Sequence, residues 1–449
     1  MQRKTAILLL GLMVLGGGIR WAVMEWTFPT RLVGDEGYYF VVARNLARDG
    51  VAKYDDSRAL RPPAHPFFLS LLIPGAGVDA DGSVPLQLHR LLLLQVALGT
   101  AVVLLTGLLG QALFDRRTGW LAGLVAAFDP NLIAFSHYLW SENLFTVILL
   151  CGLLIVVKGQ KTPGFSHATA AGLVFGIGAL TRETALLIGG MAAVWWLATA
   201  AKLERRRALG KGALLCTVAV GCVLPWTLRN YQVLGRVVPV STIGWFAAGE
   251  GNSLEEPDWM QAWGPRRASF KSAYFEVPGE VERMDFARRY TLERIREEQP
   301  AWIFKKLVRN STQLFTPDSP LLYKIRRGAY GPVSNGVMNA LVAVSAVPYS
   351  LVFLAGTLGI AAARGNGRLL LPCLVVGISL LTHVLTNATV RFRLPLMPLF
   401  IIYAGRAIVA RHAIPGSMSR GRWLALGAVW LFFFALCVPY LRDANQALF

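Results

Sequence analysis

Apolar runs long enough to cross a bilayer recur along almost the whole chain of 449 residues. A transmembrane helix needs about 20 predominantly apolar residues, and only helices or closed barrels satisfy every backbone polar group in lipid. Charged residues make up only 16% of the chain, whereas soluble domains usually carry about 25%. The sequence therefore predicts an all-α polytopic membrane protein with about eleven transmembrane helices.

Basic residues cluster between these runs, on alternate loops, for example at Arg116-Arg117, 202–211 and 411–422. Such clusters normally face the cytoplasm. We therefore expect a cytoplasmic N-terminus, with loops 26–85 and 228–335 on the extracytoplasmic side. The net charge of +19 is then explained by membrane orientation, which argues against a nucleic-acid partner. The expected spans are about 5–25, 86–114, 119–135, 141–157, 166–181, 184–200, 212–227, 336–362, 369–385, 394–410 and 423–439.

The first outer loop has helical patterns of its own. An amphipathic helix is expected over 37–49, where Gly50 ends it, and a second short helix over 66–73. Both are too short to span a bilayer, so we expect them to lie at the membrane interface.

The predicted organisation has three parts. Residues 1–227 form an N-terminal membrane module whose first outer loop, 26–85, carries the catalytic residues. Residues 228–335 mix acids and bases, show a helical pattern near 281–310 and form an extracytoplasmic cap segment. Residues 336–449 form the C-terminal membrane helices.

An acidic pair, Asp35-Glu36, follows the first span between Gly34 and Gly37. Acids at a membrane surface are costly unless they are functional, paired or hydrated. Two interpretations are open for this pair. The acids cap the helix over 37–49, whose N-terminal dipole favours negative charge, or they belong to a functional site.

Further charged residues lie on the same outer side. Arg61 stands in the first loop, Glu142 at the outer end of a span, and Arg391 and Arg393 just before another. Each arginine alone is explained as an interfacial anchor, and the glutamate as a partner of a helix dipole. Acids and arginines that converge from separate hairpins instead indicate an anionic ligand and acid–base chemistry.

Six motifs occur in an order that is familiar from one family. Together with the topology they resemble bacterial glycosyltransferase family 39, of the GT-C superfamily, which is related to protein O-mannosyltransferases and the lipid A aminoarabinose transferase. The motifs are Gly34-Asp35-Glu36-Gly37-Tyr38-Tyr39, Arg61-Pro62-Pro63-Ala64-His65-Pro66, Ser141-Glu142-Asn143-Leu144-Phe145, Gly178-Ala179-Leu180-Thr181-Arg182-Glu183, Pro225-Trp226-Thr227-Leu228-Arg229-Asn230-Tyr231 and Arg391-Phe392-Arg393-Leu394-Pro395.

The resemblance implies a GT-C type helix bundle and an enzyme that works on the outer face of the bacterial inner membrane. The family's first-loop acid, its catalytic carboxylate, is matched here by Asp35, and its second-loop acid by Glu142. The basic residue before Pro-Pro, which contacts the lipid phosphate, is matched by Arg61. Aminoarabinose transferases carry an acid, a candidate metal ligand, where this chain has Leu60. The resemblance therefore leaves a divalent metal open and implies no other cofactor.

The sequence thus predicts a membrane glycosyltransferase that moves a sugar from a polyprenyl-phosphate donor to a lipid, glycan or protein acceptor. The predicted catalytic residues are Asp35, Glu36 and Glu142. The residues predicted to bind the lipid phosphate are Arg61, Arg391 and Arg393, and the candidate substrate contacts are Tyr38, His65 and Arg182.

Two other functions stay open on the sequence. A transporter or flippase of polyprenyl-linked lipids would share the apolar bulk and the phosphate-binding arginines. It would not need an acid pair in a structured outer loop, and the chain shows no inverted repeat of the kind common in transporters. An oligosaccharide polymerase or ligase is the third possibility. The acid pair favours the transferase.

Overall fold

The computed structural model describes residues 3–73, 83–160, 162, 164–253, 265–363 and 365–443. Residues 74–82 of the first outer loop and 254–264 of the predicted cap segment therefore lie outside the described part. The described residues form helices and loops, and no strand is found among them.

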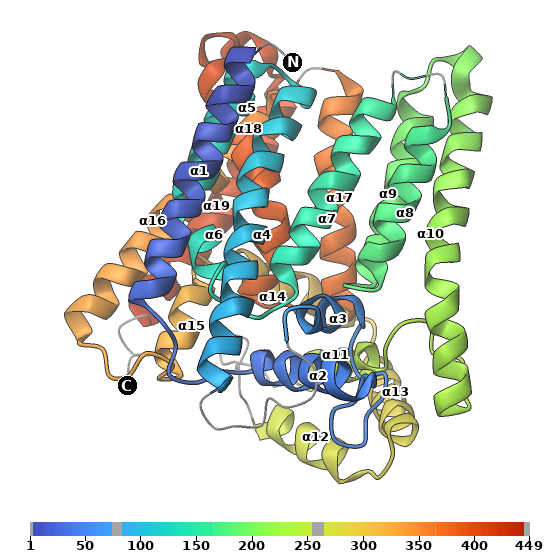
Figure 1. The fold of residues 1–449 in the computed structure, drawn as a ribbon. Coiled ribbons are helices and arrows are strands. Elements are labelled where there is room, and N and C mark those ends of the chain that lie inside the picture. Colours follow the sequence, from blue (N-terminus) through green and yellow to red (C-terminus); the bar gives the residue numbers. More distant parts are fainter. Residues whose placement is uncertain are drawn as a thin grey trace.

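A helix lies at each of the eleven predicted spans, and these helices run side by side in one bundle (Figure 1). Seven of them are long and apolar enough to cross a membrane. The all-α, multi-pass architecture is thereby confirmed, and the other four helices stay predicted spans. The eleven are α1 (Arg3–Trp26), α4 (Ser83–Leu113), α5 (Arg116–Phe128), α7 (Glu142–Gly159), α8 (Ser166–Ala179), α9 (Thr184–Thr199), α10 (Arg205–Leu234), α16 (Asn335–Ala361), α17 (Asn366–Leu385), α18 (Met397–Val409) and α19 (Arg420–Asp443).

The span predicted at 119–135 is not one helix. It breaks at Asp129 into α5 and the short α6 (Pro130–Phe135). Asp129 caps α6 by accepting from the Leu132 amide at 2.9 Å, and Pro130 begins the new helix because its ring cannot continue the old one. The carbonyls that α5 leaves unpaired inside the bundle accept from Arg20, which is fully buried and donates to Ala126 at 3.0 Å and to Ala127 at 3.1 Å.

Small residues let the helices pack closely. On α5, a Cβ added to Gly119 would lie 2.5 Å from the Gly107 carbonyl of α4. This approach is possible only for glycine, and small residues at helix contacts are typical of membrane bundles, where the hydrophobic effect gives no drive between helices.

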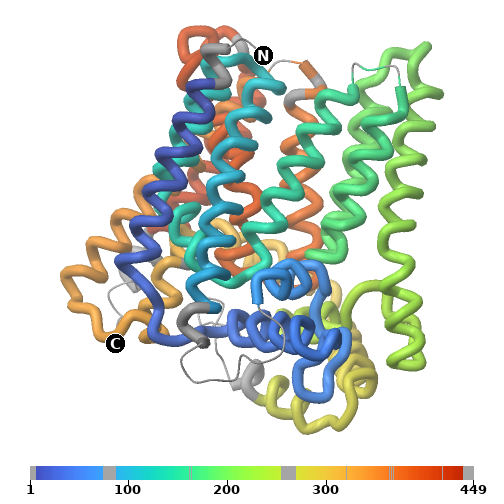
Figure 2. The backbone as a smooth tube through the Cα atoms, in the orientation of Figure 1, coloured from blue at the N-terminus to red at the C-terminus, as the bar shows by residue number. Residues whose placement is uncertain are grey.

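One end of the bundle carries the short outer helices, and the N-terminus lies at the opposite end (Figures 1 and 2). The two helices expected in the first outer loop are found as α2 (Asp35–Asp49) and α3 (Ala64–Ser70). Beside them lie α11 (Ile243–Asn252), α12 (Pro265–Glu276) and α13 (Glu280–Glu297). The chain then continues through α14 (Trp302–Phe315) and α15 (Pro320–Arg326), and a 3₁₀ helix, η3 (Val390–Leu396), leads into α18.

Candidate functional site

Asp35 lies between two arginines that come from distant parts of the chain. Its Oδ1 is 2.8 Å from Arg61 Nη2, and its Oδ2 is 2.7 Å from Arg391 Nη1. Asp35 is the first residue of α2, after Gly34, which has φ +60° and ψ −129°. A side chain at Gly34 would be strained there and would meet the Tyr323 hydroxyl at 2.9 Å. The glycine thus lets α2 begin with Asp35 turned toward the arginines.

The charges continue from Arg391 to a second acid. Arg391 Nε is 3.6 Å from Glu142 Oε1, and the same oxygen is 2.7 Å from Arg182 Nη2. Glu142 is the first residue of α7, and Arg182 lies in the tight turn between α8 and α9. We call these five residues the charge cluster: Arg61, Asp35, Arg391, Glu142 and Arg182.

Aromatic rings line the charge cluster. The Arg61 guanidinium lies 5.3 Å from the Tyr38 ring, and that of Arg391 lies 4.8 Å from Trp140. Arg182 and Arg391 are both 5.0 Å from the Phe392 ring. Rings at these distances stabilise cations, and they also limit the directions in which the arginines can move.

The charge cluster has three positive and two negative side chains, so it carries a net charge of +1. Burial alone would raise the pKa of the Asp35 carboxyl, but the charges of Arg61 and Arg391 outweigh burial and hold the pKa well below its usual range. The side chains of Asp35 and Arg391 are 21% and 23% exposed, whereas Glu142 is buried. A solute can therefore reach the Asp35 end, where the surplus positive charge favours an anion.

Glu36, the other member of the acid pair, faces away from the charge cluster into the protein. It is fully buried, and its Oε1 is 2.7 Å from Lys324 Nζ of α15. Its oxygens also accept from the amides of Val33 at 3.0 Å and Leu139 at 3.1 Å. Burial raises the pKa of Glu36 and lowers that of Lys324, while the ion pair opposes both shifts. Glu36 therefore ties α2 to two neighbouring segments.

Arg393 does not join the charge cluster either. Its guanidinium is buried, donates to the carbonyls of Leu314, Thr316 and Asp318, and lies 3.8 Å from the Tyr349 ring. With its donors used in this way, Arg393 fastens η3 to the end of α14.

Two of the three candidate substrate contacts lie beside the charge cluster, in addition to Arg182 within it. Tyr38 is half-buried against Arg61, and burial raises the pKa of its hydroxyl well above the usual range. His65 is fully buried and hydrogen-bonds the Leu139 carbonyl at 3.0 Å. Burial lowers the pKa of His65 to about 4, so the ring is neutral near pH 7. His65 is thus a buried structural neighbour of the site, whereas Tyr38 lines the site itself.

The residues of the charge cluster do not form a metal site. The described part of the chain holds no group of three or more His, Cys, Asp or Glu side chains placed to bind a metal ion. Asp35 presents both oxygens to guanidinium groups, and Glu142 Oε1 faces Arg182 and Arg391. A divalent cation needs several oxygen or imidazole donors. Here guanidinium groups already occupy the space next to the carboxylate oxygens of Asp35 and Glu142.

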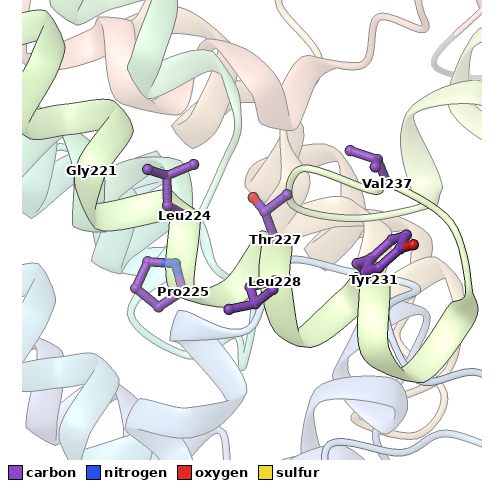
Figure 3. A pocket seen from close by; sticks show the side chains of 7 residues that line it. All are labelled: Gly221, Leu224, Pro225, Thr227, Leu228, Tyr231 and Val237. Carbon is purple, nitrogen blue, oxygen red and sulfur yellow. The ribbon is translucent and has the colours of Figure 1, made fainter.

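A hollow of about 670 Å³ lies along the C-terminal half of α10 (Figure 3). Its lining is almost wholly apolar and includes no member of the charge cluster, so we do not place the chemistry there. It is lined by Gly221, Leu224, Pro225, Thr227, Leu228, Tyr231 and Val237.

Besides Trp140 and Phe392, three further residues near the site were not anticipated from the sequence. Lys324 pairs with Glu36, and Tyr39 donates to the Ser141 hydroxyl at 3.3 Å beneath the charge cluster. Tyr39 and Ser141 stand inside the recognised motifs, which could have indicated them. No sequence signal links Lys324 to the first outer loop.

Residues 61–226, just over a third of the chain, match the family model of dolichyl-phosphate-mannose-protein mannosyltransferase. The matched region begins at Arg61 and includes Glu142 and Arg182. It confirms the resemblance predicted from the motifs. No curated protein matches the chain.

Solved structures of an archaeal oligosaccharyltransferase confirm the fold. The whole chain is similar to the oligosaccharyltransferase AglB from Archaeoglobus fulgidus in complex with an inhibitory peptide and a dolichol-phosphate, with a TM-score of 0.55 and 14% identity. The Zn and sulfate complex of that protein matches 98% of this chain, again with a TM-score of 0.55 and 14% identity. This chain spans only 56% and 53% of those two chains. ArnT from Cupriavidus metallidurans bound to undecaprenyl phosphate matches 92% of this chain and 80% of its own, with 14% identity and a TM-score of 0.43.

Proposed function

We propose that this multi-pass membrane protein, whose residues 61–226 match the protein mannosyltransferase family, is a glycosyltransferase with a polyprenyl-phosphate sugar as donor. The observation that carries the proposal is the position of Asp35, held between Arg61 and Arg391 at the end of the bundle opposite to the N-terminus. A carboxylate beside paired guanidinium groups provides both a proton acceptor and a binding place for a phosphate.

In the proposed reaction, an acceptor hydroxyl attacks the anomeric carbon of the donor sugar, and a new carbon–oxygen bond forms. The bond from that carbon to the phosphate oxygen breaks, and the phosphate keeps the electron pair. Asp35 receives the acceptor proton. Arg61 and Arg391 stabilise the charge that develops on the leaving phosphate, in a site where water is scarce and such contacts are strong.

Donor binding also prepares Asp35 for this role. The two arginines hold the pKa of Asp35 low, and so strong a carboxylic acid is a weak base. A phosphate that binds the same guanidinium groups shares their charge and adds negative charge nearby, and both effects raise the pKa of Asp35. Glu142 keeps Arg391 and Arg182 in place behind the reacting atoms.

For two other predicted site residues, the contacts support a role different from the predicted one. We assign Glu36 and Arg393 to holding the site together rather than to catalysis or phosphate binding, because the protein already uses their polar atoms. We expect the acceptor, a lipid, glycan or protein, to approach from the extracytoplasmic side of a bacterial inner membrane.

The test is turnover by the purified protein with synthetic polyprenyl phosphates that carry different sugars, followed by mass spectrometry of the acceptor fraction. Wild-type protein should release polyprenyl phosphate and add one sugar mass to an acceptor. Asp35→Asn should lower the rate by about 10²–10⁴-fold, the usual worth of a general base. Asp49→Asn is the matched control, since Asp49 is an exposed acid at the other end of α2.

Two outcomes would contradict the proposal. Near-wild-type turnover by Asp35→Asn would remove Asp35 from the chemistry. Movement of the intact donor across the membrane of proteoliposomes, with no product formed, would identify a flippase.

A further inference from the structure

The loop that carries Arg61 is held by groups from segments that are distant in the sequence. We call residues 56–61 the Arg61 loop. It links α2 to α3 and lies against α10, the start of α11 and the start of α13, which the chain reaches only much later (Figure 1).

Glu280, the first residue of α13, makes the most concentrated of these contacts. Its Oε2 accepts from the Arg58 amide at 2.6 Å, and its Oε1 accepts from the Ala59 amide at 3.1 Å. The Thr242 hydroxyl donates to the same Oε1 at 2.8 Å. Glu280 is only 5% exposed, so both oxygens depend on these donors. A buried carboxylate that takes two successive amides fixes the direction of the backbone as well as its position.

Further contacts hold the carbonyl side of the same residues. Arg229 of α10 donates to the Arg58 carbonyl at 2.9 Å, and the Thr242 amide donates to the Ala59 carbonyl at 2.9 Å. Every backbone polar group of Arg58 and Ala59 thereby has a partner outside the Arg61 loop.

The chain is fixed again directly after Arg61. Pro62 and Pro63 restrict the backbone, and the Ala64 amide donates to the Leu180 carbonyl at 2.8 Å. Arg61 therefore stands between two anchored points, two residues after one and three before the other. The segment between these two points is too short to absorb a displacement of Glu280. Such a displacement would therefore move the Arg61 guanidinium.

We propose that Glu280 is a positioning residue for Arg61, and through it for the donor phosphate. The inference rests on the proposed function, because it takes Arg61 as a phosphate ligand. It also gives a function to part of the predicted cap segment, because α13 supplies the carboxylate that fixes the backbone of the Arg61 loop. Displacements of about 1 Å in a positioned group are enough to lower reaction rates strongly. A displaced Arg61 guanidinium would also contact the donor phosphate less well. Loss of the Glu280 anchor should therefore reduce donor affinity, although Glu280 itself is not proposed to touch the substrate.

The alternative is that Glu280 only stabilises the fold. The Arg283–Asp56 ion pair, at 2.6 Å, also joins α13 to the Arg61 loop, and this pair keeps the two segments together when Glu280 is changed. The two interpretations differ in what they predict for donor binding at unchanged stability.

The experiment measures binding of a synthetic polyprenyl phosphate to the full chain in lipid nanodiscs, with thermal midpoints of the same samples. Glu280→Gln keeps the size of the side chain but turns an amide group toward backbone donors, and it should weaken binding about tenfold. Asp285→Asn, on the same helix, is the matched control, because Asp285 pairs with the exposed Arg236 and should bind like wild type. Thr242→Val removes one donor to Glu280 and gives a milder second variant if Glu280→Gln does not fold.

A double variant separates this inference from the function on which it rests. Once Arg61→Ala has removed the phosphate ligand, adding Glu280→Gln should cause no further loss of binding, because the two residues act through one contact. Wild-type affinity in Glu280→Gln and Thr242→Val, or an equal further loss in the Arg61→Ala background, would overturn the positioning role alone. If Arg61→Ala itself binds like wild type, the proposed donor site fails instead.

Discussion

Two acids that are neighbours in the sequence have different surroundings. Asp35 faces arginines at a partly exposed site, whereas Glu36 is buried with Lys324. Successive residues on a helix point about 100° apart, so one residue of α2 reaches the charge cluster and the next reaches the protein interior. The sequence shows the pair but not this division, because the partner that decides it comes from α15.

The same limit explains Arg393. Arg391 and Arg393 flank Phe392, and the sequence treats them alike. The 3₁₀ geometry of η3 has three residues per turn, which directs residues two apart to different sides. Arg391 therefore meets Asp35, and Arg393 meets the carbonyls at the end of α14.

We predict that the Glu36–Lys324 pair supports folding. Removing one partner of a buried ion pair leaves an uncompensated charge and costs about 3–5 kcal/mol, so Lys324→Met should lower the thermal midpoint clearly. The double variant Glu36→Leu/Lys324→Met should recover much of that loss, since no charge is left unpaired. Wild-type stability in Lys324→Met with lost turnover would instead place Glu36 in the chemistry.

At the scale of elements, α14 buries polar residues and exposes apolar ones, the reverse of a helix on the surface of a soluble protein. Lys306 and Asn310 are buried, and they donate to carbonyls of α11 and of the end of α17. Phe304 and Val308, by contrast, are 72% and 61% exposed. The sequence suggested one helical pattern near 281–310. The chain instead divides into α13 and α14, and packing against α17 decides which face of α14 is covered.

We predict that the exposed face of α14 lies in the outer leaflet of the bilayer. Its neighbour α17, against which α14 packs, also has exposed apolar residues, Leu381 and Leu385. An environment-sensitive fluorophore attached at a cysteine in place of Phe304 should be quenched by brominated lipids. Phe275 of α12 is equally apolar and 65% exposed, and a fluorophore there should not be quenched. Equal quenching at both sites, or at neither, would contradict this placement.

For the whole molecule, the order of apolar runs was enough to predict the helix bundle, and the helical patterns of the first outer loop predicted its short helices. The predicted topology also brought Asp35, Arg61, Glu142 and Arg391 to one end, as the structure has them, whereas Arg393 faces elsewhere. Each span reverses the chain's direction, so counting spans gives the side of every loop. The break after α5 was missed because a span predicted from apolar residues does not show the effect of a few polar ones. Asp129 caps a new helix, and Arg20 from α1 satisfies the carbonyls left inside the bundle.

The bundle makes a test of topology possible. The segment just before α10 and helix α12 lie at opposite ends of the molecule (Figure 1). Leu203 belongs to the first and Ser272 to the second, and both are exposed. In a background without the exposed Cys373, cysteines at these positions should react with an impermeant thiol reagent from opposite sides of the membrane. Position 272 should be labelled in intact cells, and position 203 only after the cells are opened. Labelling of both from outside would overturn the orientation.

The central claim is that the charge cluster binds the phosphate of a polyprenyl-phosphate donor, and affinity for a synthetic polyprenyl phosphate tests it most directly. Arg61→Ala removes a charge-assisted contact worth about 1.5–3 kcal/mol and should weaken binding at least tenfold. Arg61→Lys should recover part of the affinity, since the charge remains but the planar fork is lost. Arg48→Ala removes an equal charge from the exposed face of α2 and should leave affinity unchanged. Wild-type affinity in Arg61→Ala, with Arg48→Ala behaving the same, would contradict the account.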